Sequence, residues 1–108
     1  DVPRLLNATR RERFAYAEEA AKDKDTLRHL FQSWLAYWRD LLLVSSGAVT
    51  PLVHLEFSDD LHRLAEQVDR RTAHACTARL EDALQKLDAN INPRLLTEVL
   101  LLDWPFLA

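Results

Sequence analysis

Hydrophobic positions recur every three to four residues through most of the chain, which is the spacing of an amphipathic α-helix. The clearest run lies in a helix that we expect to begin near Asp25 and to end near Gly47. Its apolar residues follow helical spacing without interruption: Leu27, Leu30, Phe31, Trp34, Leu35, Trp38, Leu41 and Leu42. Because Trp34 and Trp38 are one turn apart, they lie on the same face, and we expect both to be core residues.

The stretch from Asn90 to Pro105 predicts a short and almost wholly apolar helix. Asn92 is a good N-cap, and Pro93 suits the first helical position, where its missing N–H costs nothing. The residues that follow are mostly aliphatic, and Pro105 blocks further helix. A helix this short and this apolar is typically covered on most of its sides. We therefore expect it to lie near the centre of a helical bundle.

Three further helices complete the expected set. One extends from about Pro3 to Lys22, and its charges are interpreted as a solvated face: Arg10, Arg11, Glu12, Arg13, Glu18 and Glu19. Ser58 begins a third helix, and Asp69 can cap a fourth, although these two could also form one long helix. Leu52 to Phe57 are expected to form an extended connector. The sequence predicts one all-α domain of five helices over residues 1–108.

Composition agrees with a helical domain, since one Gly and four Pro are few for a protein built from hairpins. The formal net charge of −3 gives no bulk electrostatic case for binding nucleic acid or an anionic membrane. The lone Cys76 cannot form an internal disulfide, so a reducing, cytoplasmic compartment is the natural interpretation. Because the chain begins at Asp1 and contains no Met, we expect it to be a fragment of a longer protein.

The residues with catalytic or metal-binding chemistry do not form a recognisable motif. Four histidines are scattered along the chain, at His29, His54, His62 and His74. His74-x-Cys76 lacks the second pair of ligands that a zinc site needs, and one Gly cannot build a phosphate-binding loop. Cys76 lies on an apolar stripe and is expected to be a core residue. We therefore expect no catalytic residue, no cofactor and no metal within the chain.

Four segments carry a family resemblance when they are taken together in their order and spacing. They are Arg10-x-x-x-Phe14-x-x-Ala17-Glu18, Trp34-Leu35-x-x-Trp38-Arg39-Asp40-Leu41-Leu42-Leu43, the connector Leu52 to Phe57, and Asn90-Ile91-Asn92-Pro93-Arg94-Leu95 with Glu98-Val99-Leu100-Leu101-Leu102. With these segments the chain resembles the C-terminal helical collar domain of bacterial DNA polymerase III clamp-loader subunits, and among them most closely delta-prime.

The resemblance implies a role in assembly. Subunits of this family carry an AAA+ ATPase-type module ahead of the collar, and that module would be absent from these residues. Five related subunits form a hetero-pentamer that is held together by its collars, while the AAA+ modules bind nucleotide, primed DNA and the sliding clamp. The implied partners of this chain are therefore the other clamp-loader subunits, with no direct nucleic-acid site and no membrane contact.

A collar should expose apolar residues beyond those that a five-helix core needs, because it has to meet its neighbours. The candidates lie at helix ends or away from the main core stripes: Leu43, Val44, Trp104, Phe106 and Leu107. Alternatively, Trp104 and Phe106 fold back and cap the end of the bundle.

A second functional interpretation is a ligand-sensing or dimerisation domain of a transcription regulator. Its pocket would be lined by Trp34, Trp38 and Trp104. A void among these rings with converging polar groups would favour that interpretation, whereas a close-packed core with apolar residues on the outside would favour the collar.

Overall fold

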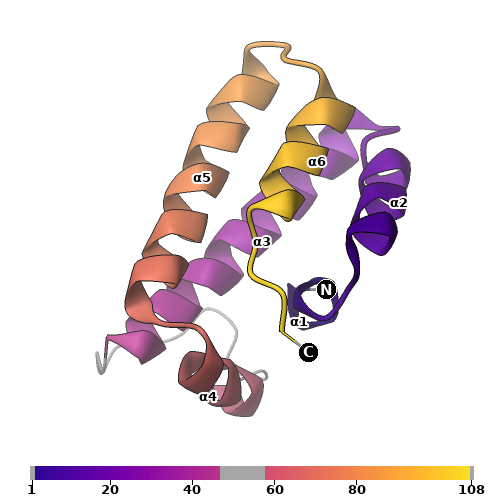
Figure 1. Cartoon of the computed structure of the whole chain (residues 1–108). Helices are drawn as coiled ribbons and strands as arrows, with labels where there is room; N and C mark the ends of the chain where they lie inside the picture. Colours follow the sequence, from indigo (N-terminus) through magenta and orange to yellow (C-terminus); the bar gives the residue numbers. More distant parts are fainter. Residues whose placement is uncertain (1, 47–57, 108) are drawn as a thin grey trace.

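The computed structural model describes residues 2–46 and 58–107, which form an all-α domain, as the sequence predicts (Figure 1). Six helices are present in these residues: α1 (Val2–Leu6), α2 (Arg10–Ala20), α3 (Lys24–Ser45), α4 (Ser58–Gln67), α5 (Arg70–Asp88) and α6 (Pro93–Leu102). Gly47 and the expected connector from Leu52 to Phe57 lie outside the described residues. No helix in the described part of the chain is long and apolar enough to cross a membrane.

The expected helix from Pro3 to Lys22 is divided into α1 and α2, which is why there are six helices and not five. Thr9 caps α2 from an extended conformation, with φ −70° and ψ 167°. Its hydroxyl accepts from the Glu12 N–H at 3.2 Å, and the Glu12 carboxylate accepts from the Thr9 N–H at 2.9 Å. This reciprocal capping box satisfies amides of the first turn and fixes where α2 begins.

α3 is the helix on which the core is built. Asp23 caps it, and not Asp25 as expected, by accepting from the Asp25 N–H at 3.2 Å and from the Thr26 hydroxyl at 2.6 Å. The predicted stripe is confirmed, because six of its residues are buried: Leu27, Phe31, Trp34, Leu35, Trp38 and Leu41. α5 packs along α3 and adds a second apolar stripe to the same core: Ala73, Cys76, Leu80, Ala83 and Leu87.

α4 and α5 are two separate helices, which settles a boundary that the sequence left open. Asp69 caps α5, and its carboxylate accepts from the Thr72 N–H at 2.7 Å. α5 ends in a turn at Asn90, whose φ of 62° is left-handed. The N–H of Ile91 donates to the Lys86 carbonyl at 3.1 Å, which satisfies an end carbonyl of the helix and turns the chain towards α6.

α6 begins as the sequence predicts, with the Asn92 side chain accepting from the Leu95 N–H at 3.1 Å and with Pro93 at the first position. The helix lies between α2 and α5, with α3 behind it (Figure 1). It thus has helices on both sides, but it does not lie at the centre of the bundle as expected, because its burial is one-sided. Thr97, Leu100 and Leu101 face the core, whereas the side that points away from α3 carries exposed leucine and valine side chains. The expectation that most sides of this helix are covered is wrong.

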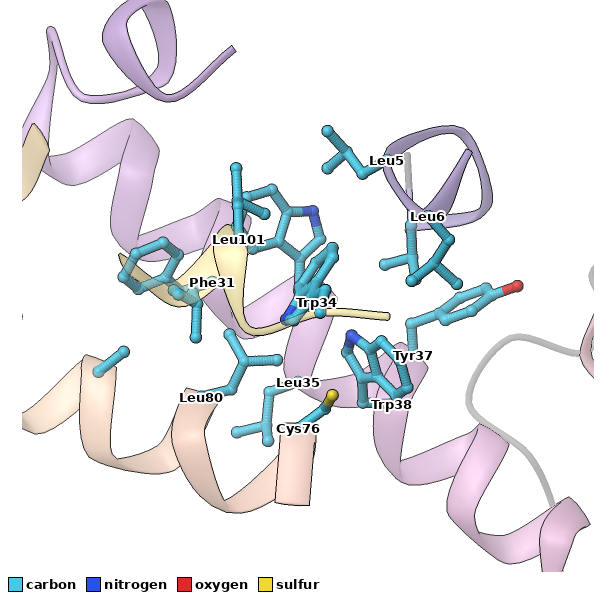
Figure 2. Packing of buried hydrophobic residues seen from close by; sticks show 14 of the residues in the cluster. Leu5, Leu6, Phe31, Trp34, Leu35, Tyr37, Trp38, Cys76, Leu80 and Leu101 are labelled. Atoms are coloured by element: carbon cyan, nitrogen blue, oxygen red, sulfur yellow. The ribbon is translucent and has the colours of Figure 1, made fainter. Parts of the chain in front are cut away.

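Aromatic rings fill the space between α3 and the chain that follows α6. Trp104 folds back onto α3, and its ring centroid lies 5.0 Å from that of Trp34 and 5.5 Å from that of Trp38, both edge to face. The ring centroid of Phe31 lies 5.6 Å from that of Trp34, with the two rings tilted relative to each other. Figure 2 shows Phe31, Trp34 and Trp38 with the α5 side chains packed against α3. These offset and edge-on contacts are the arrangements that aromatic pairs prefer in a close-packed core.

Candidate functional site

The chemically reactive residues of the described chain do not gather into a site. Within residues 2–46 and 58–107, no group of three or more His, Cys, Asp or Glu side chains could hold a metal ion. Cys76 is 1% exposed, and burial raises the pKa of its thiol to about 11. A thiol is a nucleophile only when it is ionised, so Cys76 acts here as a small core residue.

The five residues predicted to meet other subunits lie in three different environments. Leu43 and Val44 are half-buried near the end of α3, and Val44 packs against the core. Leu107 is also half-buried against the core. Phe106 is 58% exposed, whereas Trp104 is 3% exposed. The expected exposure of Trp104 is wrong, and the alternative that it folds back holds for this residue, because its ring packs edge to face against those of Trp34 and Trp38. Phe106 does not fold back in this way and remains on the surface.

A row of exposed apolar side chains, which is not expected of a helix covered on most of its sides, follows the outer side of α6. Leu95, Val99 and Leu102 are 57%, 52% and 40% exposed and have the i, i+4, i+7 spacing of one helix face. Phe106 continues the row beyond the end of the helix, and we call these four side chains the α6 apolar face. Because α6 is apolar on nearly all sides, hydrophobic periodicity could not distinguish its outer face from its buried one.

Charged side chains border the α6 apolar face, and several of them already form ion pairs. On α6 itself, the Arg94 guanidinium donates to the Glu98 carboxylate at 2.9 Å. On the α5 side, Arg79 lies 3.6 Å from Asp103, beside an open groove of about 230 Å³ whose lining includes Val99. An apolar centre with a polar rim is the usual composition of a protein–protein interface.

A buried arginine lies where α2, α1 and the end of α6 meet. Arg13 is 4% exposed, and its guanidinium donates to five backbone carbonyls, those of Leu5 (2.9 Å), Leu6 (3.3 Å), Leu101 (2.8 Å), Trp104 (2.9 Å) and Pro105 (2.8 Å). A guanidinium has five N–H groups, so every donor is used. Burial lowers the pKa of Arg13, but an arginine keeps its charge in proteins. That charge is favourable beside the carbonyls at the end of α6, which form the negative end of the helix dipole.

The expectation that Arg13 belongs to a solvated charged face is wrong. Its neighbours Arg10, Arg11 and Glu12 are exposed as expected, and Arg13 alone among them turns inward. One signal in the sequence points to this burial. Arg13 precedes the buried Ala17 by four residues and so shares the inward face of α2 with it.

The three tryptophans form a packed cluster, which does not favour the interpretation as a ligand-sensing domain. That interpretation needs a void among the rings of Trp34, Trp38 and Trp104, but the ring of Trp104 contacts the other two edge to face. The indole N–H groups have no hydrogen-bond partner among the described residues, so the three rings pack without side-chain hydrogen bonds between them.

Comparison with known proteins identifies the family of this chain. Neither a search of curated proteins nor a search of solved structures found a match. A family model described as "DNA polymerase III, delta subunit, C terminal" matches residues 4–105. This range includes the α6 apolar face as far as Leu102, together with Arg13 and all five carbonyls that it binds. The match confirms the resemblance to a DNA polymerase III clamp-loader subunit, and the chain belongs to the family of C-terminal domains of the DNA polymerase III delta subunit.

Proposed function

We propose that this chain is the assembly domain, or collar, of a delta-prime-like subunit in a cytoplasmic DNA polymerase III clamp loader. Its role is to hold the subunit beside its neighbours in a hetero-pentamer, without catalysis of its own. Membership of the delta-subunit family supports a place in the replication complex. The four sequence segments support the delta-prime kind of subunit and an AAA+ module ahead of the collar.

The observation that carries this proposal is the α6 apolar face. Its four side chains are each between 40% and 58% exposed, and three of them lie on one side of one helix. Fully burying a side chain of this kind is worth roughly 1.5–3 kcal/mol, so burying the exposed half of all four is worth about 4 kcal/mol. That free energy corresponds to roughly a thousandfold in affinity. A contiguous apolar surface with a polar rim is typical of a protein-binding site.

A subunit inside a ring of unlike subunits needs a different contact face for each of its two neighbours. We assign the α6 apolar face to one neighbour, together with Leu107, which follows Phe106 in the chain. Leu43 and Val44 near the end of α3 are proposed for the other neighbour. They are half-buried in the domain, so a neighbour would complete their burial.

The test is a binding measurement between this chain and the other clamp-loader subunits of the same organism, by analytical ultracentrifugation or calorimetry. Val99→Glu places a charge at the centre of the α6 apolar face. We expect it to weaken binding about a hundredfold, because a buried unpaired charge costs several kcal/mol. Ala78→Glu on the exposed side of α5 is the matched control, since it adds the same charge away from that face.

Binding by the Val99→Glu variant that equals wild type would refute the assignment of this face. An equal loss of binding in the Ala78→Glu variant would also refute it, because the effect would then come from net charge alone. Circular dichroism of both variants checks that the helices are unchanged.

A further inference from the structure

We propose that Arg13 is a positioning residue of the assembly surface, which holds the chain after α6 so that Phe106 lies beside Leu102. The inference rests on the proposed function, because it concerns the α6 apolar face. It goes further by assigning the geometry of that face to one buried side chain on a different helix.

The residues after α6 have no helix of their own to fix them. Trp104 is anchored by its ring in the core, and the Leu107 N–H donates to the Leu6 carbonyl at 2.7 Å. Between these two anchors, the guanidinium of Arg13 binds the carbonyls of Trp104 and Pro105. The peptide that leads directly into Phe106 is therefore held by Arg13.

Arg13 also lines a groove of about 370 Å³ between α2 and the end of α6. Two parts of the chain line this groove with Arg13. One is the start of α2, with Ala8, Thr9 and Arg10, and the other is the end of α6 and the residues after it, with Leu102, Trp104 and Phe106. Arg13 donates to the carbonyls of α1 at one edge and to those of α6 and the following residues at the other. One planar side chain thus joins α1 to the end of α6 beside this groove.

The chemistry of the guanidinium explains why arginine stands at this position. Its five N–H groups point outward in one plane, so it can reach carbonyls that lie on opposite sides of it. A lysine carries all three of its N–H donors on one nitrogen atom and cannot span the same set. Because all five donors of Arg13 bind backbone carbonyls, none is left for an anionic ligand.

An apolar side chain contributes most to binding when it is already held in its bound position. If the chain after α6 were loose, Phe106 would have to be ordered during association, which would weaken binding. Arg13 is expected to act on affinity through Phe106, although the two side chains are far apart in sequence.

The experiment is a double-mutant cycle with Arg13→Lys and Phe106→Ala, measured against the clamp-loader subunits used above and at a temperature where every variant is folded. We expect each single variant to bind about tenfold more weakly than wild type, as for a residue near an interface hot spot. The double variant should bind about as weakly as Phe106→Ala alone, because the effect of Arg13 passes through Phe106.

Two controls separate positioning from stability. Arg11→Lys makes the same change at an exposed position of α2 and should leave the affinity unaltered. Leu27→Ala removes a core side chain from α3 and lowers stability without touching the groove, so it too should bind like wild type. A loss of affinity in Leu27→Ala would show that stability alone explains the effect of Arg13→Lys.

Wild-type affinity in Arg13→Lys would overturn the inference. So would a double variant whose affinity falls by the product of the two single fold-changes, because the two residues would then act independently. In both cases the effect of Val99→Glu would still stand as evidence for the assembly surface.

Hydrogen exchange tests the positioning without any partner. The Leu107 amide, which donates to the Leu6 carbonyl, should exchange at least about tenfold faster in Arg13→Lys, while the amides of α3 remain unchanged. An equal exchange rate at this amide would refute the inference.

Discussion

Replacing Arg13 with methionine removes all five of its hydrogen bonds while it keeps an unbranched side chain in the same space. Three of the carbonyls also accept from a backbone N–H, namely those of Leu5, Leu6 and Leu101. The carbonyls of Trp104 and Pro105 lose the only partner that they have among the described residues. A buried acceptor without a partner, as at Trp104, costs about 1–3 kcal/mol, and the part-buried acceptor of Pro105 costs about as much as the lower end of that range. Burial of the apolar methionine returns roughly 1 kcal/mol, so we expect the free energy of unfolding to fall by about 3 kcal/mol.

Urea unfolding followed by tryptophan fluorescence measures this loss, since Trp104 lies beside the replaced group. With a urea m-value of roughly 1.5 kcal/mol/M, the midpoint should fall by about 2 M. Arg11→Met on the exposed side of α2 is the control, and it should change the free energy of unfolding by less than about 0.5 kcal/mol. If Arg13→Met lowers the free energy of unfolding by less than about 1 kcal/mol, the reasoning is refuted. The free energy that the five hydrogen bonds contribute would then be nearly cancelled by the cost of burying the guanidinium.

Three further predictions concern stability. Thr9→Ala removes the capping box of α2 and should lower the free energy of unfolding by about 1 kcal/mol in urea titrations; no change would mean that α1 alone fixes the start of α2. Asn90→Ala should lower the melting temperature by about 4 °C, because alanine tolerates a left-handed φ of 62° less well, whereas Asn90→Gly should be close to neutral. Burial raises the pKa of Cys76 to about 11 and that of Tyr37 to about 12, above their values in the unfolded chain. Stability should therefore be constant below about pH 8 and fall as the pH rises above about 9, as the unfolded state loses these protons first; a flat urea midpoint from pH 7 to pH 10 would contradict this.

The sequence predicted best those features that depend on local rules. The α3 stripe was visible because large apolar residues repeat at helical spacing, and all of the residues from Leu27 to Leu41 in that stripe pack into the core. Asn92 and Pro93 marked the start of α6 correctly, because N-capping involves only the first turn of a helix. The same kind of signal, Thr9 with Glu12, also marks the break between α1 and α2, but the run of helix-forming residues around it concealed the break.

The features that escaped prediction depend on contacts between distant parts of the chain. Arginine is seldom buried, and the partners of Arg13 include carbonyls 88 to 92 residues away, which no local pattern reveals. Leu95 and Val99 looked like core residues because hydrophobicity does not tell which side of α6 the other helices cover. Trp104 and Phe106 are two residues apart and still lie in opposite environments, which only the path of the chain after α6 determines.

The most direct test of the central proposal is native mass spectrometry of this chain, alone and mixed with the collar domains of the other clamp-loader subunits from the same organism. We predict hetero-oligomers of defined stoichiometry, formed by the wild-type chain and lost in the Val99→Glu variant. A well-folded chain that forms no complex with any of these subunits at high micromolar concentration would contradict the proposal that this domain holds the clamp loader together.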